Sequence, residues 1–275
     1  MDGARFLTYQ KVNSRRLRLR GLALPNEHGS WSILLEPLVA GIAVAPSPAS
    51  AFIVMLFAGG FLARQPLKVS LTNLKTGWKM PHTRAAKALA LSFLAFASAG
   101  LCGTWILAGP ASLLTLAVAA PLAILQISYD VAGKSRRLIP ELAGAAALSS
   151  SAAIAAHAAG WSSINALALS GIFVLRLIPS MLYVRQRLVL EKRKQASVSL
   201  PVAAHICAIA IAIMMASAGI CPKLVVGAFV VLLIRAAIGL SPWRRKLRAM
   251  QIGILEIVFG AVTLLSVIIG HYLNI

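Results

Sequence analysis

Residues 199–218 have the sequence SLPVAAHICAIAIAIMMASA, which contains no aspartate, glutamate, lysine or arginine. A helix of about 20 such residues spans the roughly 30 Å hydrocarbon core of a bilayer, because each residue adds about 1.5 Å. Other apolar runs of similar length flank this stretch. We therefore predict nine membrane helices, over residues 30–46, 48–64, 85–107, 110–129, 139–158, 162–186, 199–218, 221–240 and 251–272.

The composition of the whole chain leads to the same fold class. Of 275 residues, 59% are hydrophobic and 12% are charged, which is far too apolar for a soluble domain of this size. A membrane β-barrel would need short segments of alternating polarity, which the sequence does not have. The expected fold is all-α and polytopic: a basic arm over residues 1–24, then one nine-helix membrane domain over residues 25–275.

Lysine and arginine are concentrated between the predicted helices. Of 27 such residues, 24 lie in the N-terminal arm or in connections near residues 62–87, 129–140, 185–197 and 241–249. Positive connections resist translocation, so we expect these segments and the N-terminus in the cytoplasm and the C-terminus outside, in a multi-pass protein of the bacterial inner membrane. The net charge of +20 predicts anionic lipid headgroups as partners and no nucleic acid, because the cations sit between apolar runs.

The cysteines carry no sign of metal or disulfide chemistry. Cys102, Cys207 and Cys221 lie within or at the ends of apolar runs, without a CxxC motif or a cysteine–histidine cluster. We interpret them as packing residues, and we predict no cofactor and no metal site.

Glu36 and Glu256 lie inside predicted helices. A carboxylate in lipid is costly unless it meets a cation or lines a cavity, so both are candidates for a functional relay, and Glu36 is also a candidate catalytic acid or base. Pro37 and Pro179 remove backbone donors beside Glu36 and Arg176, which predicts bent helices there. The alternatives are a structural ion pair for the glutamates and ordinary packing for the prolines.

Arg176 is the sharpest polar signal in the chain. It precedes Arg185 by nine residues and therefore lies about 13 Å deeper along the same predicted helix. Ser180, Tyr183 and Arg187 follow at spacings that place all of them on the face of Arg176. Since a guanidinium at this depth needs a partner or water, we expect this face to point inward and to open toward the cytoplasm.

Two further segments carry candidate chemistry. Lys134, Arg136 and Arg137 precede a helix predicted to begin near Pro140, and cations at a helix N-terminus favour an anion site. The alternative for these cations is an ordinary positive-inside loop. The segment PNEHGSW, residues 25–31, enters the first helix, where Glu27 and His28 are candidates for catalytic proton transfer.

The pattern P-x-E-H-G-x-W over residues 25–31 resembles the signature of the YwiC-like family of bacterial membrane proteins. The block from Lys134 to Gly144, which includes Pro140 and Glu141, is similar to a second block of that family. Together with the helix pattern, the resemblance covers roughly residues 24–272. It implies a family but no particular activity.

Nine helices with a cytoplasmic N-terminus also resemble the UbiA family of intramembrane prenyltransferases. A loop that helps to hold the prenyl diphosphate in that family has a spacing similar to that of Tyr129, Lys134, Arg136, Pro140 and Gly144. The resemblance implies a UbiA-like bundle around a central cavity. The Asp-rich motifs that bind Mg²⁺ in that family are missing, however. No aspartate occurs in residues 65–73 or 185–193, so Mg²⁺ is not expected.

Three functions remain open. The leading hypothesis is UbiA-like binding, with or without transfer, of a prenyl diphosphate or similar anionic amphiphile in a cytoplasm-facing cavity. Its expected partner is a membrane lipid or isoprenoid, held by Lys134, Arg136, Arg137, Arg176, Tyr183, Arg185 and Arg187. The second function is a transporter or exporter with a relay formed by Glu36, Arg176 and Glu256. The third is a scaffold whose basic face holds anionic lipid.

Overall fold

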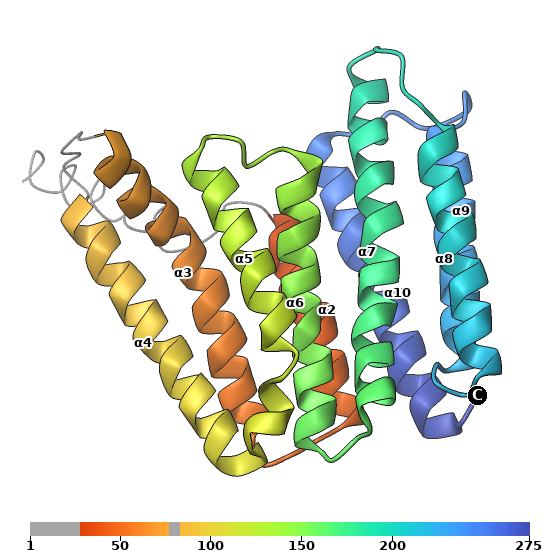
Figure 1. The fold of residues 1–275 in the computed structure, drawn as a ribbon. Coiled ribbons are helices and arrows are strands. Elements are labelled where there is room, and N and C mark those ends of the chain that lie inside the picture. The colour runs from red at the N-terminus through yellow and green to blue at the C-terminus, as the bar shows by residue number, and fades with distance from the viewer. Residues whose placement is uncertain (1–27, 77–82) are drawn as a thin grey trace, which may run out of the picture.

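The computed structural model describes residues 28–76 and 83–275 (Figure 1). Within these ranges it contains nine α-helices, one 3-10 helix and no β-strand. The elements are α2 (His28–Val44), α3 (Ser50–Thr76), α4 (Thr83–Ala108), η1 (Pro110–Leu113), α5 (Leu116–Val131), α6 (Leu138–Ala158), α7 (Ser163–Glu191), α8 (Ser199–Ser217), α9 (Lys223–Leu240) and α10 (Ala249–Leu273).

The helices confirm the predicted all-α membrane fold. Counting η1 together with α5, eight segments are long and apolar enough to cross a membrane, and α2 is a shorter apolar helix. The chain is thus a multi-pass membrane protein. Helices α3 and α7 run past their predicted ends at residues 64 and 186, because a helix can continue through cationic residues beyond the apolar run. The predicted arm over residues 1–24 lies outside the described residues.

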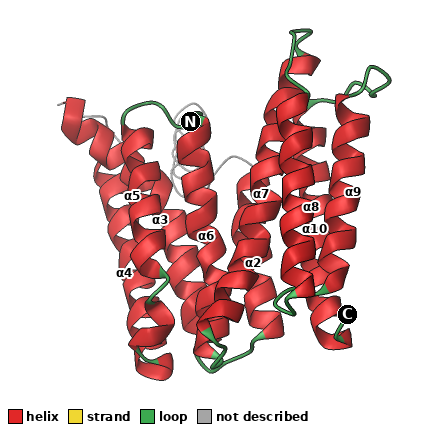
Figure 2. Cartoon of the chain, turned by 45° about the vertical axis from the view of Figure 1, so that its right-hand side comes forward, coloured by secondary structure: helices red, strands yellow, loops and turns green. Residues whose placement is uncertain are grey.

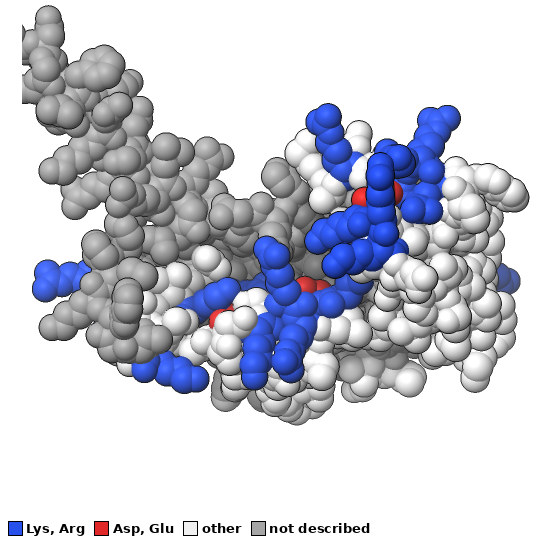
Figure 3. Space-filling model, turned by 90° about the horizontal axis from the view of Figure 1, so that it is seen from above, with Lys and Arg blue, Asp and Glu red and all other residues white. Residues whose placement is uncertain are grey.

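The helices run up and down through the bundle, and their connections gather at two ends (Figure 1). One end holds the α5–α6, α7–α8 and α9–α10 connections, and Figure 3 looks down on the lysines and arginines gathered there. We call this the basic end, which is the end that sequence analysis expects in the cytoplasm. At the opposite end, Lys223 is the lone lysine or arginine among the described residues.

Helix α6 is the central helix and packs against α2, α5 and α7. Its small side chains allow close approach: a Cβ on Gly41 of α2 would lie 2.8 Å from Ala152 Cα. The buried hydroxyls of Ser149 and Ser150 donate to the carbonyl oxygens of Ala145 and Ala147 at 2.9 and 2.6 Å. These two hydroxyls are thereby satisfied within the helix, which helps α6 to pack closely in lipid.

Helices α3 and α4 form a hairpin in which the two backbones nearly touch. A Cβ on Gly59 of α3 would lie 2.8 Å from the backbone nitrogen of Ala97. A Cβ on Gly100 of α4 would lie 2.6 Å from the carbonyl oxygen of Phe52 and would overlap the next turn of α3. Tight contacts between small residues drive helix association in lipid, where burial of apolar surface contributes little.

An ion pair links this hairpin to α5. Arg64 Nε lies 2.8 Å from Asp130 Oδ2, and Arg64 Nη2 lies 3.3 Å from Asp130 Oδ1. The carboxylate is 1% exposed, and the two-pronged geometry is the one that arginine and carboxylate prefer. A partly buried ion pair therefore holds α3 against α5, with Arg64 32% exposed.

We predict that Gly100→Ala lowers the free energy of unfolding by about 1–3 kcal/mol, because the added methyl must push α3 and α4 apart. Gly60→Ala is the matched control, since its Cβ would have no atom within 4 Å. That control should be neutral or stabilising by up to about 1 kcal/mol. Thermal unfolding of both variants in detergent measures the difference. Equal effects would contradict the backbone contact.

Candidate functional site

The polar face of α7 lies in the interior of the bundle, as its spacing predicts. Arg176, Ser180, Tyr183 and Arg187 are each no more than 5% exposed. Arg176 is near the midpoint of α7, far from either end of a 29-residue helix. At that depth a guanidinium is stable only if other protein groups contact it.

The first partner of Arg176 is Glu36 of α2. Arg176 Nη1 lies 3.1 Å from Glu36 Oε2, and the two side chains are 3% and 6% exposed. Ser32, one turn earlier in α2, donates a hydrogen bond to Glu36 Oε1. The carboxylate is thus held by one cation and one hydroxyl, on a helix that packs against α6, α7 and α10 (Figure 2).

A second buried pair lies beside the first. Arg235 of α9 donates to Glu256 Oε1 of α10. The Arg235 guanidinium also lies 4.3 Å from the centre of the Tyr183 ring and 4.9 Å from that of Phe259. Carboxylate and aromatic faces together replace the water that a guanidinium would otherwise need.

The two pairs are connected. Arg176 Nη2 donates to the backbone carbonyl oxygen of Glu256 at 2.9 Å. Arg235 Nη2 donates to the Ser180 hydroxyl at 3.4 Å, on the same α7 face as Arg176. We call Glu36, Arg176, Arg235 and Glu256 the charge network. It joins α2, α7, α9 and α10.

Two glycines make room for the charge network and its neighbours. A Cβ on Gly260 of α10 would overlap Glu36 Oε1 and lie 2.8 Å from Arg176 Nη2. A Cβ on Gly239 of α9 would overlap the Tyr183 hydroxyl. The α10 backbone therefore lies directly against the Glu36–Arg176 pair.

The charge network is formally neutral, with two guanidinium groups and two carboxylates. Removing one member would leave a buried charge without its counter-ion, which typically costs about 3–5 kcal/mol. The Nε atoms of Arg176 and Arg235 are buried and have no hydrogen-bond partner among the described residues. Since arginine has five N–H donors, both side chains keep donor capacity for a further partner.

The predicted anion-binding residue Arg187 is engaged with the protein. It is 2% exposed, and its Nη2 lies 3.0 Å from Glu191 Oε1. The same guanidinium donates to the carbonyl oxygens of Gly239 and Arg245. Arg187 thereby joins the ends of α7 and α9, and a phosphate would have to displace these partners.

The cations of the α5–α6 connection lie differently. Lys134, Arg136 and Arg137 are all exposed, and the connection that carries them lies at the basic end (Figure 1). Arg185 of α7 donates to the carbonyl oxygen of Arg136 at 2.7 Å and pairs with Glu141 at 2.8 Å. Arg185 thus fixes the connection, while the side chains of Lys134, Arg136 and Arg137 are exposed.

The acid–base residues predicted at the membrane entry are only partly described. Glu27 lies outside the described residues. His28 is the first residue of α2, and side chains are described from Ser30 onward. Of the three catalytic candidates, Glu36 is the one with described polar contacts.

Sequence analysis assigned no role to Arg235. Like Arg176 in its own helix, Arg235 is a cation inside an apolar run, and it is the lone cation in residues 224–240. No sequence pattern indicated the roles of Ser32 and Gly260, because small residues are common throughout the predicted helices. Only the packing of α2 and α10 shows what they contact.

Carboxylates near the basic end are each paired with an arginine. Asp130 faces Arg64, Glu141 faces Arg185, and Glu191 faces Arg187. In the part of the chain that the structure describes, no group of three or more histidine, cysteine, aspartate or glutamate side chains has an arrangement that could hold a metal ion.

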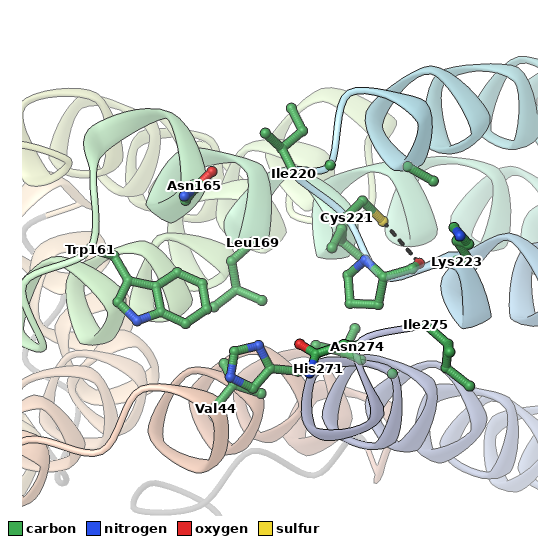
Figure 4. A pocket seen from close by; sticks show the side chains of 16 residues that line it. Val44, Trp161, Asn165, Leu169, Ile220, Cys221, Lys223, His271, Asn274 and Ile275 are labelled. Carbon is green, nitrogen blue, oxygen red and sulfur yellow. Dashed lines mark hydrogen bonds between the residues drawn. The ribbon is translucent and has the colours of Figure 1, made fainter.

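A cavity of about 580 Å³ opens at the opposite end (Figure 4). It is lined by the ends of α2, α7, α8 and α10, by Trp161 and by the α8–α9 connection. Burial raises the pKa of the Cys221 thiol in this lining to about 11. Sequence analysis expected a cavity that faces the cytoplasm, whereas this cavity lies away from the basic end.

Comparison with models of known protein families matches residues 24–156 to the family described as YwiC-like protein. No curated protein matches the chain, and no solved structure matches it. The matched segment ends within α6. It contains Glu36 and the three exposed cations of the α5–α6 connection, but none of α7, α9 or α10.

We predict that Gly260→Ala lowers the free energy of unfolding by about 2–4 kcal/mol, because the methyl must displace Glu36 from Arg176. Gly253→Ala makes the same change on the same helix, at a position where the Cβ would have no atom within 4 Å. Chemical or thermal unfolding in detergent should separate the two variants. If both unfold like the wild type, Gly260 does not hold α10 against the pair.

Proposed function

The chain belongs to the YwiC-like family over residues 24–156, and we propose that it is a membrane transporter for a small charged solute. The observation that carries the proposal is the charge network, two connected arginine–glutamate pairs buried between four helices. Ionisable residues inside membrane bundles commonly mark a solute or proton pathway.

The arginine–glutamate pairs allow a charged solute to exchange places with a glutamate. An anionic solute at Arg176 would replace Glu36, and the released glutamate could then take up a proton. Because the network is neutral overall, such an exchange moves charge between partners without leaving a bare ion in the bundle. The unpartnered Nε atoms of Arg176 and Arg235 supply donors for the incoming group.

The helices that carry the first pair also contain proline. Pro37 follows Glu36 directly, and Pro179 is three residues after Arg176. Each proline removes the backbone N–H that would bond to the carbonyl one turn earlier, at Ile33 and Leu175. A transporter must alternate between two arrangements, and helices weakened at these points can bend beside the charges that exchange.

Proteoliposomes that contain a pH-sensitive dye test this proposal. With a potential set by potassium and valinomycin, we expect the wild type to move protons or solute faster than protein-free vesicles, for at least one of a panel of small carboxylates, amino acids and organic cations. Glu36→Gln should reduce the rate at least tenfold, because the amide cannot take up the proton.

Glu141→Gln is the control, since it removes a carboxylate that pairs with an arginine near the surface, where both side chains are about one-third exposed. Its transport rate should stay close to that of the wild type. The proposal fails if the wild type moves nothing in the panel, or if folded Glu36→Gln transports as fast as Glu141→Gln.

A second function is favoured by the exposed cations of the α5–α6 connection. We propose as the alternative that Lys134, Arg136 and Arg137 bind the headgroup of an anionic amphiphile, such as a prenyl diphosphate. The support is their exposure, and the carbonyl contact by which Arg185 holds the connection in place. Guanidinium groups match phosphate oxygens in pairs, so they can bind a diphosphate without a metal ion.

Native mass spectrometry of the detergent-purified protein tests this alternative. Combined replacement of Lys134, Arg136 and Arg137 by glutamine should remove a co-purified anionic lipid or isoprenoid diphosphate. The matched control replaces Lys192, Arg193 and Lys194, three exposed cations of the α7–α8 connection. An adduct that survives the first triple change, or is lost equally from both, would contradict the alternative.

A further inference from the structure

Among the side chains that line the cavity at the opposite end, Lys223 is the one that carries a permanent charge. At the rim, Lys223 supplies an ammonium group, and His271, Asn165 and Asn274 supply further polar groups (Figure 4). No aspartate or glutamate side chain is part of the lining. Lys223 is also the lone lysine or arginine of that end in the described ranges. The rim therefore favours a ligand that accepts hydrogen bonds and carries negative charge.

The remainder of the cavity is apolar. Leu169 and Ile172 of α7 and Val267 of α10 lie below the rim. Trp161 forms a wall, and its ring centre lies 5.4 Å from that of His271 with the planes tilted by 30°. Such a surface favours an aliphatic or aromatic group, because the transfer of apolar surface out of water lowers the free energy.

The size of the cavity argues for a ligand. Its volume of about 580 Å³ is within the range of small-molecule sites, which are concave and mostly apolar. We propose that this cavity binds a small amphiphilic anion, with its carboxylate or phosphate head at Lys223 and its apolar body against Leu169, Ile172 and Val267.

This site is separate from the charge network. Ile172 at its floor precedes Arg176 by one turn of α7, about 6 Å along the helix axis, but no member of the charge network lines the cavity. Binding here does not depend on the proposed transport function. A binding measurement therefore tests the site whether or not the protein moves a solute.

Calorimetry on the full chain in zwitterionic lipid nanodiscs, with the heat of empty nanodiscs subtracted, measures the binding. We expect saturable binding of octanoate or octyl phosphate, and the better of the two identifies the head group. Octylammonium has the same apolar chain with the opposite charge, and it should bind at least tenfold more weakly. Equal binding of octylammonium would overturn the proposal, as would the absence of saturable binding by both anions.

Variants then locate the site. Lys223→Gln should weaken anion binding about tenfold, while Lys192→Gln, an exposed lysine of the basic end, should leave it unchanged. Ala216→Phe fills the cavity from α8 and should also weaken binding. Unchanged affinity in Lys223→Gln overturns the role of the ammonium. Full affinity in folded Ala216→Phe overturns the cavity as the site.

Discussion

Hydrocarbon cannot solvate a charge, and this constraint determines the arrangement of the helices that carry charges at mid-depth. Glu36 and Arg176 are tolerated there because α2 and α7 bring Glu36 Oε2 and Arg176 Nη1 to 3.1 Å. Ser32 donates a hydrogen bond to Glu36, and Gly260 leaves space for the pair because it has no side chain. Either charge is stable at this depth only when the opposite charge lies beside it. The pair therefore fixes the registers of α2, α7 and α10 together, and any sliding of one helix would leave a buried ion without a counter-ion.

The other half of the bundle is held together by a different physical effect. Helices α3 and α4 carry no buried charge pair between them and rely on direct backbone contact at Gly59 and Gly100. Close packing of this kind depends on the absence of side chains and can occur wherever small residues align. The Arg64–Asp130 contact joins this hairpin to α5. Charge pairing gives specific register, whereas small-residue packing gives close approach.

Helix α7 connects three chemical environments along its length. Its first turns contribute Asn165, Leu169 and Ile172 to the cavity at the opposite end, and its middle contributes Arg176 to the charge network. Its last turns bring Arg185 to the α5–α6 connection at the basic end. A change in the position of this one helix would therefore alter contacts in all three environments. Both the proposed exchange of partners at Arg176 and the proposed anion site depend on groups carried by this helix.

The sequence by itself determined the fold class, the approximate helix ranges, the division into two ends and the inward face of α7. These follow from apolar run length, charge placement and helical periodicity, which are local properties. Which glutamate meets which arginine was decided by tertiary structure alone, because residues 36, 176, 235 and 256 are far apart in the chain. The same holds for Gly260, which resembles many other glycines until α10 packs on α2. The cavity could not be predicted from the sequence, since its lining comes from four distant stretches of the chain that meet only when the whole bundle packs.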